Sequence, residues 1–256
     1  MSFSLRLSIL SACIALYTIA LHTAPLSADG VGIVGSDDRV ISTEAKFAAV
    51  GRLNKSGTGF CTATLIAPDL IVTAAHCVYY SRTKKPIPPN RLHFVANWRR
   101  GKHQAHRRGA IVRIAKDFVF DAPGSSDRLR ADLALIQLER PIAPNVIKPI
   151  RVEREFRKLR LTTPLTQVAY SADRPHLPVI ERGCIVREED DELLLTDCDS
   201  NFGSSGAPVL EEKGGQLRLL AVSVAVISDG VLRRAAALRA AQIETVRRTG
   251  RNPHNP

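Results

Sequence analysis

The sequence predicts an all-β protein, built as a barrel or a sandwich, and three observations support this fold class. The 256 residues are 45% hydrophobic and 24% charged, which is typical of a folded globular protein. Apolar runs of strand length recur along the chain, separated by clusters of Gly, Pro, Asn and Asp. Only residues 237–249 are rich in good helix formers, and Gly250 is placed to end a C-terminal helix there.

A proline-rich connector, residues 139–153, divides the predicted strands into two sets. The first set comprises residues 46–53, 62–67, 70–75, 91–97, 110–115 and 133–138. The second set comprises residues 165–171, 192–197, 207–212, 217–226 and 231–239. Runs of this length are typical of strands. Because the connector lies between the two sets, we interpret it as the boundary between two structural units.

Residues 1–28 have the features of a secretory signal peptide. Arg6 precedes an apolar run over residues 7–21, and small residues follow that run as far as Ala28. The run is short for a membrane span, so we predict cleavage near Ala28 and export to the periplasm or beyond. The alternative is a bacterial lipoprotein signal, which the tetrapeptide LSAC at residues 10–13 resembles.

Export would remove Cys13 and leave four cysteines in an oxidising compartment, where thiols pair. Four cysteines allow three connectivities. The local choices are Cys61 with Cys77 and Cys184 with Cys198, which are 16 and 14 positions apart. Closing loops of this size stabilises a fold by about 3 kcal/mol each in the chain-entropy treatment. A zinc site is the alternative, but no cysteine belongs to a C-x-x-C pair, so we predict two disulfides.

The chain carries a net charge of +11, from 36 basic and 25 acidic residues. Much of the excess lies in residues 97–116 and 232–252. A solvated, cationic surface on an exported protein accounts for it, and attraction to an anionic surface such as lipid head groups is the alternative. Aromatic residues are few near these arginines, so stacking on bases is disfavoured and no nucleic-acid partner is expected.

The stretch DCDSNFGSSGAPV, residues 197–209, places Ser204 and Ser205 between two glycines. Glycine is used where the backbone takes a positive φ or approaches another group closely. The stretch is therefore either a simple turn or the seat of an exposed nucleophile whose neighbouring N–H groups converge. The second interpretation requires a base elsewhere in the chain.

Two further stretches supply a base and a carboxylate. LIVTAAHCV, residues 70–78, places His76 at the end of an apolar strand and next to Cys77, whose disulfide would hold the backbone still. RADLALIQL, residues 130–138, places Asp132 at the start of another apolar strand. Burying that carboxylate costs several kcal/mol, on the order of 3 or more, unless it is paired, and an imidazole N–H would pair it.

The blocks TAAHC, DLALIQL and GSSGAP, in that order, resemble those of the chymotrypsin-like (trypsin-like) serine peptidases. The resemblance runs from about Gly32 to the C-terminal helix, and GIVGSDDRV at residues 32–40 is similar to the bacterial secreted branch that includes glutamyl endopeptidases. It implies two six-stranded antiparallel barrels, residues 29–143 and 144–256, the second followed by the C-terminal helix.

The resemblance also implies a role for each residue of the three blocks. Ser205 would be the nucleophile, His76 the general base and Asp132 the group that orients the imidazole. The N–H groups of Gly203 and Ser205 would form the oxyanion hole, and Ser204 would be a bystander. The implied activity is that of a secreted, monomeric serine endopeptidase of bacterial origin. It would hydrolyse proteins or peptides through an acyl-enzyme intermediate, with no metal or cofactor.

Two positions depart from the family pattern. Animal trypsin-like enzymes have an aspartate before the nucleophile, which pairs with the new N-terminus after zymogen cleavage, but Ser204 stands there. The same activation switch cannot operate. The cysteine that usually lies four positions before the nucleophile is replaced by Asn201, so Cys184 and Cys198 join a different hairpin.

The substrate pocket is predicted from the same resemblance. An aspartate six positions before the nucleophile, here Asp199, would select arginine or lysine, and Ser223, Val224 and Ala225 would form the pocket wall. Glutamyl-specific relatives have a histidine just before that wall, where this chain has Val222, so acidic substrates are disfavoured. The alternative is that Asp199 only caps a turn.

A non-catalytic binding protein that keeps the scaffold and uses its basic surface is the alternative function. Degenerate members would lose a triad residue or an oxyanion glycine, and this chain has all of them, so catalysis is preferred. The remaining histidines of the mature chain match no motif and are interpreted as surface or packing residues: His93, His103, His106, His176 and His254.

Overall fold

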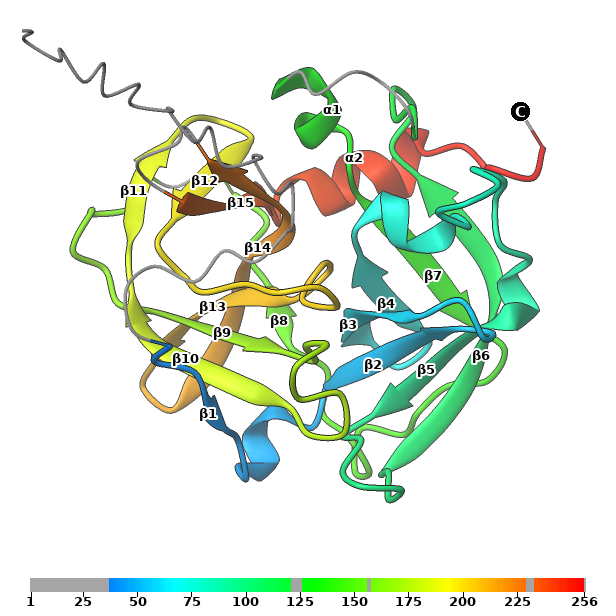
Figure 1. Cartoon of the computed structure of the whole chain (residues 1–256), viewed down its shortest axis with the longest axis horizontal. Coiled ribbons are helices and arrows are strands. Elements are labelled where there is room, and N and C mark those ends of the chain that lie inside the picture. The colour runs from blue at the N-terminus through cyan, green and yellow to red at the C-terminus, as the bar shows by residue number, and fades with distance from the viewer. Residues whose placement is uncertain (1–36, 121–125, 156–157, 229–232, 256) are drawn as a thin grey trace, which may run out of the picture.

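The computed structural model describes residues 37–120, 126–155, 158–228 and 233–255. Within them the chain forms two β-units that lie side by side (Figure 1). The predicted signal peptide and Cys13 lie outside the described residues. No helix in the described part of the chain combines the length and hydropathy of a membrane span.

The first unit is a closed antiparallel barrel of six strands in the order β2-β3-β4-β7-β6-β5. The strands are β2 (Val50–Lys55), β3 (Phe60–Ala67), β4 (Leu70–Thr73), β5 (Leu92–Ala96), β6 (Ala105–Ile114) and β7 (Ala134–Leu138). Three short 3₁₀ helices accompany it: η1 (Ala45–Phe47), η2 (Ala75–Val78) and η3 (Pro89–Arg91). Each predicted strand of the first set overlaps one of these strands, and this barrel agrees with the prediction.

The second unit is a nine-stranded sheet in the order β1-β10-β9-β13-β14-β15-β12-β11, with β8 beside β14. The strands are β1 (Val40–Ile41), β8 (Arg151–Val152), β9 (Leu165–Ala169), β10 (Val179–Cys184), β11 (Val186–Glu189), β12 (Leu193–Thr196), β13 (Pro208–Lys213), β14 (Gln216–Ser228) and β15 (Arg233–Arg239). The described strands therefore number nine where six antiparallel ones were predicted. The additional strands include β1, which pairs with β10, and β8, which pairs in parallel with β14, because the 13 residues of β14 are long enough to pair with both β15 and β8.

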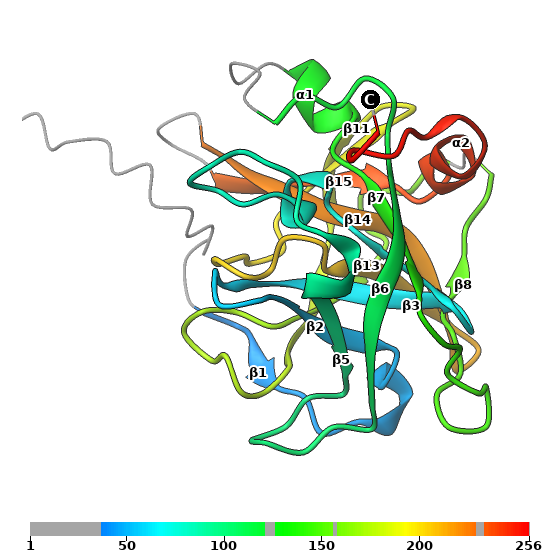
Figure 2. The ribbon, with the colours of Figure 1, turned by 90° about the vertical axis from the view of Figure 1, so that its right-hand side faces the viewer.

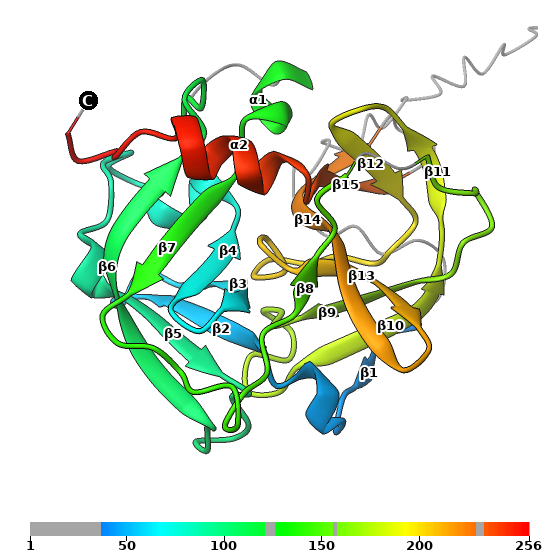
Figure 3. The ribbon, with the colours of Figure 1, turned by 180° about the vertical axis from the view of Figure 1, so that it is seen from behind.

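Two helices complete the structure, α1 (Ser126–Arg130) and α2 (Gln242–Thr249). Helix α2 contacts β6 and β7 of the barrel as well as β15 of the sheet, and Figure 3 shows it lying across both units. It begins after the predicted residue 237 because the chain up to Arg239 pairs with β14. It ends where predicted, as the N–H of Gly250 donates to the Val246 carbonyl.

The two units share one core. The largest cluster of buried apolar side chains includes Leu65 and Ile136 of the barrel, Leu210 and Val222 of the sheet, and Ile243 of α2. Burying each such side chain stabilises the fold by about 2 kcal/mol. The loop before β13 lies against β3, as the two views in Figures 1 and 2 show. This loop carries Ser205, so the packing of the two units also sets the position of the predicted nucleophile.

Candidate active site

His76 and Asp132 meet where two neighbouring barrel strands have their ends. Strands β4 and β7 pair with Thr73 opposite Ala134, so η2 after β4 lies beside the residue before β7. The Nδ1 of His76 lies 2.7 Å from Asp132 Oδ2, and the backbone N–H of His76 donates to Oδ1 at 2.8 Å. Asp132 is only 2% exposed. Both carboxylate oxygens thus have a partner in His76, which offsets the cost of burying the charge.

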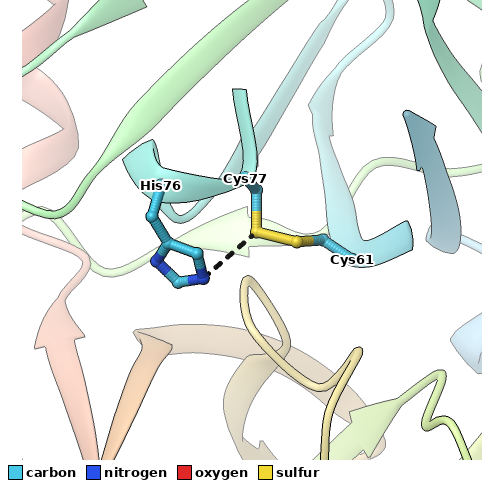
Figure 4. A group of neighbouring side chains, drawn as sticks. All are labelled: Cys61, His76 and Cys77. Carbon is cyan, nitrogen blue, oxygen red and sulfur yellow. Dashed lines mark hydrogen bonds between the residues drawn. A yellow bond between two sulfur atoms is a disulfide. The ribbon is translucent and has the colours of Figure 1, made fainter. Parts of the chain in front are cut away.

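This pairing fixes the proton on one side of the imidazole. An ionised carboxylate only accepts hydrogen bonds, so Nδ1 carries the proton and Nε2 keeps its lone pair. Nε2 lies 3.6 Å from Cys77 Sγ, in the Cys61–Cys77 disulfide (Figure 4). The imidazole is therefore arranged as a base whose free nitrogen faces away from Asp132.

Ser205 approaches the same place from the second unit. Its carbonyl oxygen lies 3.8 Å from Cys77 Sγ and accepts the N–H of Thr62 at 2.9 Å. Its side chain is partly exposed. Among the described residues no hydrogen bond joins the Ser205 hydroxyl to His76 Nε2, and in substrate-free enzymes this bond is often long. The structure thus brings Ser205, His76 and Asp132 to one site.

The two glycines beside Ser205 are required by backbone geometry. Gly203 has φ +90°, and a Cβ there would lie 2.4 Å from Phe60 Cε2. Gly206 has φ +84°, and a Cβ there would lie 2.1 Å from the Thr62 carbonyl oxygen. Any other residue at either position would be strained and would displace β3 from the loop.

The backbone N–H groups of this loop divide into two kinds. Those of Ser204 and Gly206 donate to Asn201 and Ser223 carbonyls, at 2.9 and 2.7 Å. Those of Gly203 and Ser205 donate no hydrogen bond within the described part of the chain. The two N–H groups predicted for the oxyanion hole are therefore free to bind an oxygen atom.

Thr62 of β3 binds the loop that carries Ser205, a role that sequence reasoning missed. Its Oγ1 donates to the Gly203 carbonyl at 2.9 Å and accepts the Tyr170 N–H at 2.9 Å. It is fully buried. A threonine in an apolar strand directly after Cys61 was the only available signal, and it does not identify the partners.

Asn201 and Ser204 also support the loop. The Asn201 side chain accepts the Phe202 N–H at 2.7 Å and donates to Asp173 at 3.0 Å. Ser204, predicted as a bystander, is buried, and its Oγ accepts the Asn201 N–H at 3.3 Å. These bonds hold the turn that precedes Ser205, in the absence of a disulfide at position 201.

The four predicted pocket residues separate into two pairs. Val224 and Ala225 line a cleft of about 790 Å³ that also contains His76 and Asp132. Asp199 and Ser223 are buried, at 3% exposure each, and do not line this cleft. Gln167 connects them, since its amide donates to the Asp199 carbonyl at 2.9 Å and accepts the Ser223 hydroxyl at 2.8 Å.

A second carboxyl group lies against Asp199, and sequence reasoning did not find it. Glu181 of β10 is 8% exposed and accepts the Asp199 N–H at 2.6 Å. The pKa of Glu181 is raised to about 7, and burial of the carboxyl group is the main cause. The hydrogen bond from Asp199 acts in the opposite direction, whereas the negative charges of nearby carboxylates, that of Asp199 first, also raise the pKa. Asp199 and Glu181 are therefore two neighbouring buried acids, and neither lines the cleft beside His76.

Charged residues form one rim of the cleft. Arg130 of α1 binds Asp190 at 2.5 Å and Glu192 at 3.2 Å, which connects the barrel side to the sheet side. The apolar lining beneath this rim comes from Leu129, Leu193 and Leu195 together with Val226 and Ile227. A peptide in extended conformation along β14 would therefore contact apolar, basic and acidic side chains.

The Cys61, His76 and Cys77 group is not a metal site. Their ligand atoms lie within 4.8 Å of one another, the one such group of three among the described residues. The two sulfurs are bonded to each other, as Figure 4 shows, and so neither is a thiolate ligand. The second predicted disulfide, Cys184–Cys198, is also present.

The chain is similar to known proteins both in sequence and in fold. The family described as Trypsin matches residues 40–232. Serine protease 23 of Mus musculus is 28% identical over 189 residues, which are 60% of this chain and 44% of that protein. Modular serine protease of Drosophila melanogaster is 32% identical over 99 residues, 36% of this chain and 15% of that protein. The chain thus matches less than half the length of these curated relatives.

Two solved structures share the fold. One is described as a Glu endopeptidase in complex with MPD, with a TM-score of 0.69, 20% identity, and coverage of 84% of this chain and 97% of that chain. The other is a scabies mite inactivated protease paralogue, with a TM-score of 0.65, 13% identity, and coverage of 83% and 96%. At these identities the likeness concerns the chymotrypsin-like fold alone. The family match spans most of the chain, and the chain therefore belongs to the trypsin family of serine proteases.

Proposed function

We propose that the protein is a serine endopeptidase that uses Ser205, His76 and Asp132 as a catalytic triad. The observation that carries the proposal is the buried Asp132, whose two oxygens bind the His76 ring and backbone at 2.7 and 2.8 Å. A buried carboxylate that is paired with an imidazole, beside a partly exposed serine between two positive-φ glycines, is arranged for acyl transfer.

In the first half of the reaction Ser205 Oγ attacks the carbonyl carbon of the peptide bond while His76 Nε2 takes its proton. The imidazolium that forms is stabilised by the Asp132 carboxylate. The C–N bond then breaks, His76 gives its proton to the leaving amine, and the acyl group remains as an ester on Ser205.

In the second half a water molecule replaces the amine. His76 takes a proton from the water as its oxygen attacks the ester, and returns that proton to Ser205 Oγ as the acid product leaves. In both halves the carbonyl oxygen becomes negative, and the N–H groups of Gly203 and Ser205 would bind it. Each such donor contributes about 3 kcal/mol to stabilising the transition state.

We also propose, as the finer part of the same function, cleavage after arginine or lysine. The support is the pair of neighbouring buried acids, Asp199 and Glu181, together with Val222 in place of a histidine. The competing interpretation is that Asp199 has a structural role only, because it is buried and does not line the cleft beside His76.

Export to the periplasm or to the outside of a bacterial cell is part of the proposal. The support is the pair of disulfides, Cys61–Cys77 and Cys184–Cys198, since such bonds persist in oxidising compartments.

A non-catalytic binding protein is the second candidate. One observation favours it: within the described residues the Ser205 hydroxyl has no hydrogen bond to His76. An inactivated protease paralogue among the similar structures is an example of the fold without activity. The experiment below distinguishes the two candidates.

The test is labelling by a fluorophosphonate, which reacts with an activated serine. We expect the disulfide-bonded protein to be labelled on Ser205, and Ser205→Ala and His76→Ala to abolish both labelling and peptide hydrolysis. Ser81→Ala, at an exposed serine outside the three motifs, is the matched control and should behave as the parent. A parent protein that is folded but neither labelled nor active would support the non-catalytic candidate instead.

A further inference from the structure

Three histidines that have no part in the proposed reaction gather on the first barrel. His93 lies on β5, His106 on β6 and His103 in the turn between these strands. The Nδ1 of His93 lies 2.9 Å from the Nε2 of His106, and the ring centroids of His103 and His106 are 6.1 Å apart. These residues, interpreted from the sequence as surface or packing residues, are thus close to one another.

The strand register explains why two of the rings meet. His106 is paired with Val95, so His93, two residues before Val95, projects on the same side of the sheet in the diagonal position. His106 and His103 are exposed and His93 is half-buried, so the site is open to solvent. The pair is held by two hydrogen-bonded strands, which fixes the distance between the two side chains.

The distance between the two nitrogens is suited to two ligands of one metal ion. Nitrogen ligands lie at about 2.1 Å from zinc, so two of them on one tetrahedral ion are roughly 3.4 Å apart. His93 Nδ1 and His106 Nε2 are 2.9 Å apart, so they would need to separate only slightly to bind one ion. In the metal-free state one nitrogen donates a proton to the other. To bind an ion, the donating ring would change tautomer, so that its proton moves through solvent to the other nitrogen of the same ring. Both facing nitrogens then have a lone pair, and small rotations of the two rings would direct these at one ion.

We propose that His93 and His106, with His103 as a third ligand, form a binding site for a divalent transition-metal ion. Imidazole ligands suit zinc, nickel and copper, whereas magnesium and calcium prefer oxygen. His103 is exposed in a turn, and its ring stands edge-on to that of His106 at 83°, so a rotation brings its nitrogen towards the pair. Water would complete the coordination.

The positively charged side chains near the three histidines are compatible with binding of a cation. Arg108 lies opposite His93 on the same face, but its guanidinium binds Glu139 at 3.0 Å, which balances its charge. The Arg107 guanidinium donates to the Pro141 carbonyl at 3.2 Å. Near the ion, the charge of Arg108 would therefore be balanced by Glu139, and the Arg107 guanidinium would stay hydrogen-bonded to the Pro141 carbonyl.

Metal binding would cross-link β5 to β6, and a ligand that binds only the folded state raises the melting temperature. The experiment titrates zinc into the full disulfide-bonded protein carrying Ser205→Ala, which prevents self-digestion, after removal of metals with EDTA. We expect one zinc ion per chain by calorimetry, and an increase in Tm of about 5 °C at a hundredfold excess over Kd. Magnesium and calcium should give neither effect.

The variants locate the ion. His93→Gln and His106→Gln keep a hydrogen-bonding side chain, and each should weaken zinc binding by at least about tenfold, whereas His103→Gln should weaken it less. His176→Gln, at an exposed histidine outside the cluster, is the matched control and should bind as the parent. All variants should have the parent's Tm in EDTA.

Three outcomes would overturn the proposal: no zinc binding at 100-fold molar excess, unchanged binding after His106→Gln, or loss of binding only after His76→Gln. The last outcome would assign the ion to the catalytic histidine. None of these readouts depends on peptide hydrolysis, so the metal site and the proposed function succeed or fail separately.

Discussion

Arg39 and Asp173 form an ion pair between a buried guanidinium and a carboxylate whose side chain is 32% exposed, with Arg39 Nη2 3.0 Å from Asp173 Oδ2. The Arg39 side chain is 2% exposed and also binds Asp37, with Nε 2.8 Å from Oδ1. The hydrogen bonds from Arg39 lower the pKa of Asp37 to about 2. The arginine thus holds two carboxylates that come from opposite sides.

The ion pair continues into the nucleophile loop. Asp173 accepts the side-chain amide of Asn201 at 3.0 Å, and Asn201 in turn accepts the N–H of Phe202 and of Ser204. Animal trypsin-like enzymes order this loop with an aspartate at the position of Ser204. In this chain the connection runs from Arg39 through Asp173 instead, so side chains within the folded chain can do what a new N-terminus does there.

The first prediction concerns Arg39→Ala. The substitution removes a buried guanidinium from two partly exposed carboxylates that Arg174 also binds, and it should lower the free energy of unfolding by about 1–2 kcal/mol. Because Asp173 supports Asn201, the N–H groups of Gly203 and Ser205 should lose their fixed positions. We expect kcat to fall more than KM rises, measured with a peptide substrate at a temperature where the variant is folded.

Arg182→Ala is the control for Arg39→Ala, because Arg182 is a half-exposed arginine that binds Glu44 on the surface. It should change neither kcat nor stability by more than about 0.5 kcal/mol. A folded Arg39→Ala protein with the parent's kcat would show that the ion pair does not position the loop.

The second prediction concerns Thr62→Val, which has nearly the shape of the parent residue but no hydroxyl. The Tyr170 N–H would lose its acceptor and the Gly203 carbonyl would lose a donor, both in a buried place, at a cost of about 1–3 kcal/mol. Activity should fall because Gly203 carries one of the proposed oxyanion donors. Thr62→Ser keeps the hydroxyl and should recover most of the activity, whereas equal losses in both variants would point to packing of the methyl group.

The third prediction is a pH dependence of stability that Glu181 causes. Its pKa is raised from an ordinary value of 4.5 to about 7, so the folded protein binds the proton more tightly than the unfolded chain. Its contribution to stability is therefore present below about pH 4.5 and is lost as the pH rises to about 7. The loss amounts to about 3 kcal/mol.

Glu181→Gln mimics the protonated acid and keeps an acceptor for the Asp199 N–H. The free energy of unfolding of the variant, relative to the parent, should therefore increase between pH 4.5 and 7 and stay level above that range. Urea unfolding at several pH values, with the disulfides intact, measures the free energy of unfolding of both proteins. Their difference removes the contributions of the other titrating groups, which both proteins share. A constant difference across the range would mean that Glu181 titrates normally.

The sequence was sufficient to predict that His76 and Asp132 lie together because both follow from local signals. His76 ends an apolar strand beside a cysteine, and Asp132 begins another, so a single strand pairing brings them together. Thr62, Gln167 and Glu181 gave no such signal. Each is a polar residue in a strand, and its partner comes from a distant segment, which only the packing of the two units brings close.

The same distinction applies to the fold. The strands of the closed barrel were predicted because they are apolar runs with clear turns between them, and the barrel itself was implied by the family resemblance. Strands β10 and β11 were missed, since residues 179–189 contain many charged side chains that face solvent. The start of α2 was misplaced because the alanine-rich segment before it, a good helix former, pairs with β14 instead. Tertiary pairing outweighed local propensity there.

The last prediction concerns substrate preference, for which Asp199→Ser is the decisive variant. Asp199 and Glu181 are two neighbouring buried acids, and a basic substrate side chain in the proposed pocket would be attracted to their charge, whereas an apolar one would not. Cleavage-site mapping on a peptide library should therefore find arginine and lysine before the cut bond in the parent. In Asp199→Ser the kcat/KM for these substrates should fall at least about a hundredfold, with a smaller loss for leucine or phenylalanine. Ser200→Ala, at the neighbouring buried serine, is the matched control and should keep the basic preference. If the parent cleaves after leucine, phenylalanine and arginine equally well while Ser205→Ala is inactive, the triad stands and Asp199 serves only the packing of the loop that follows Cys198.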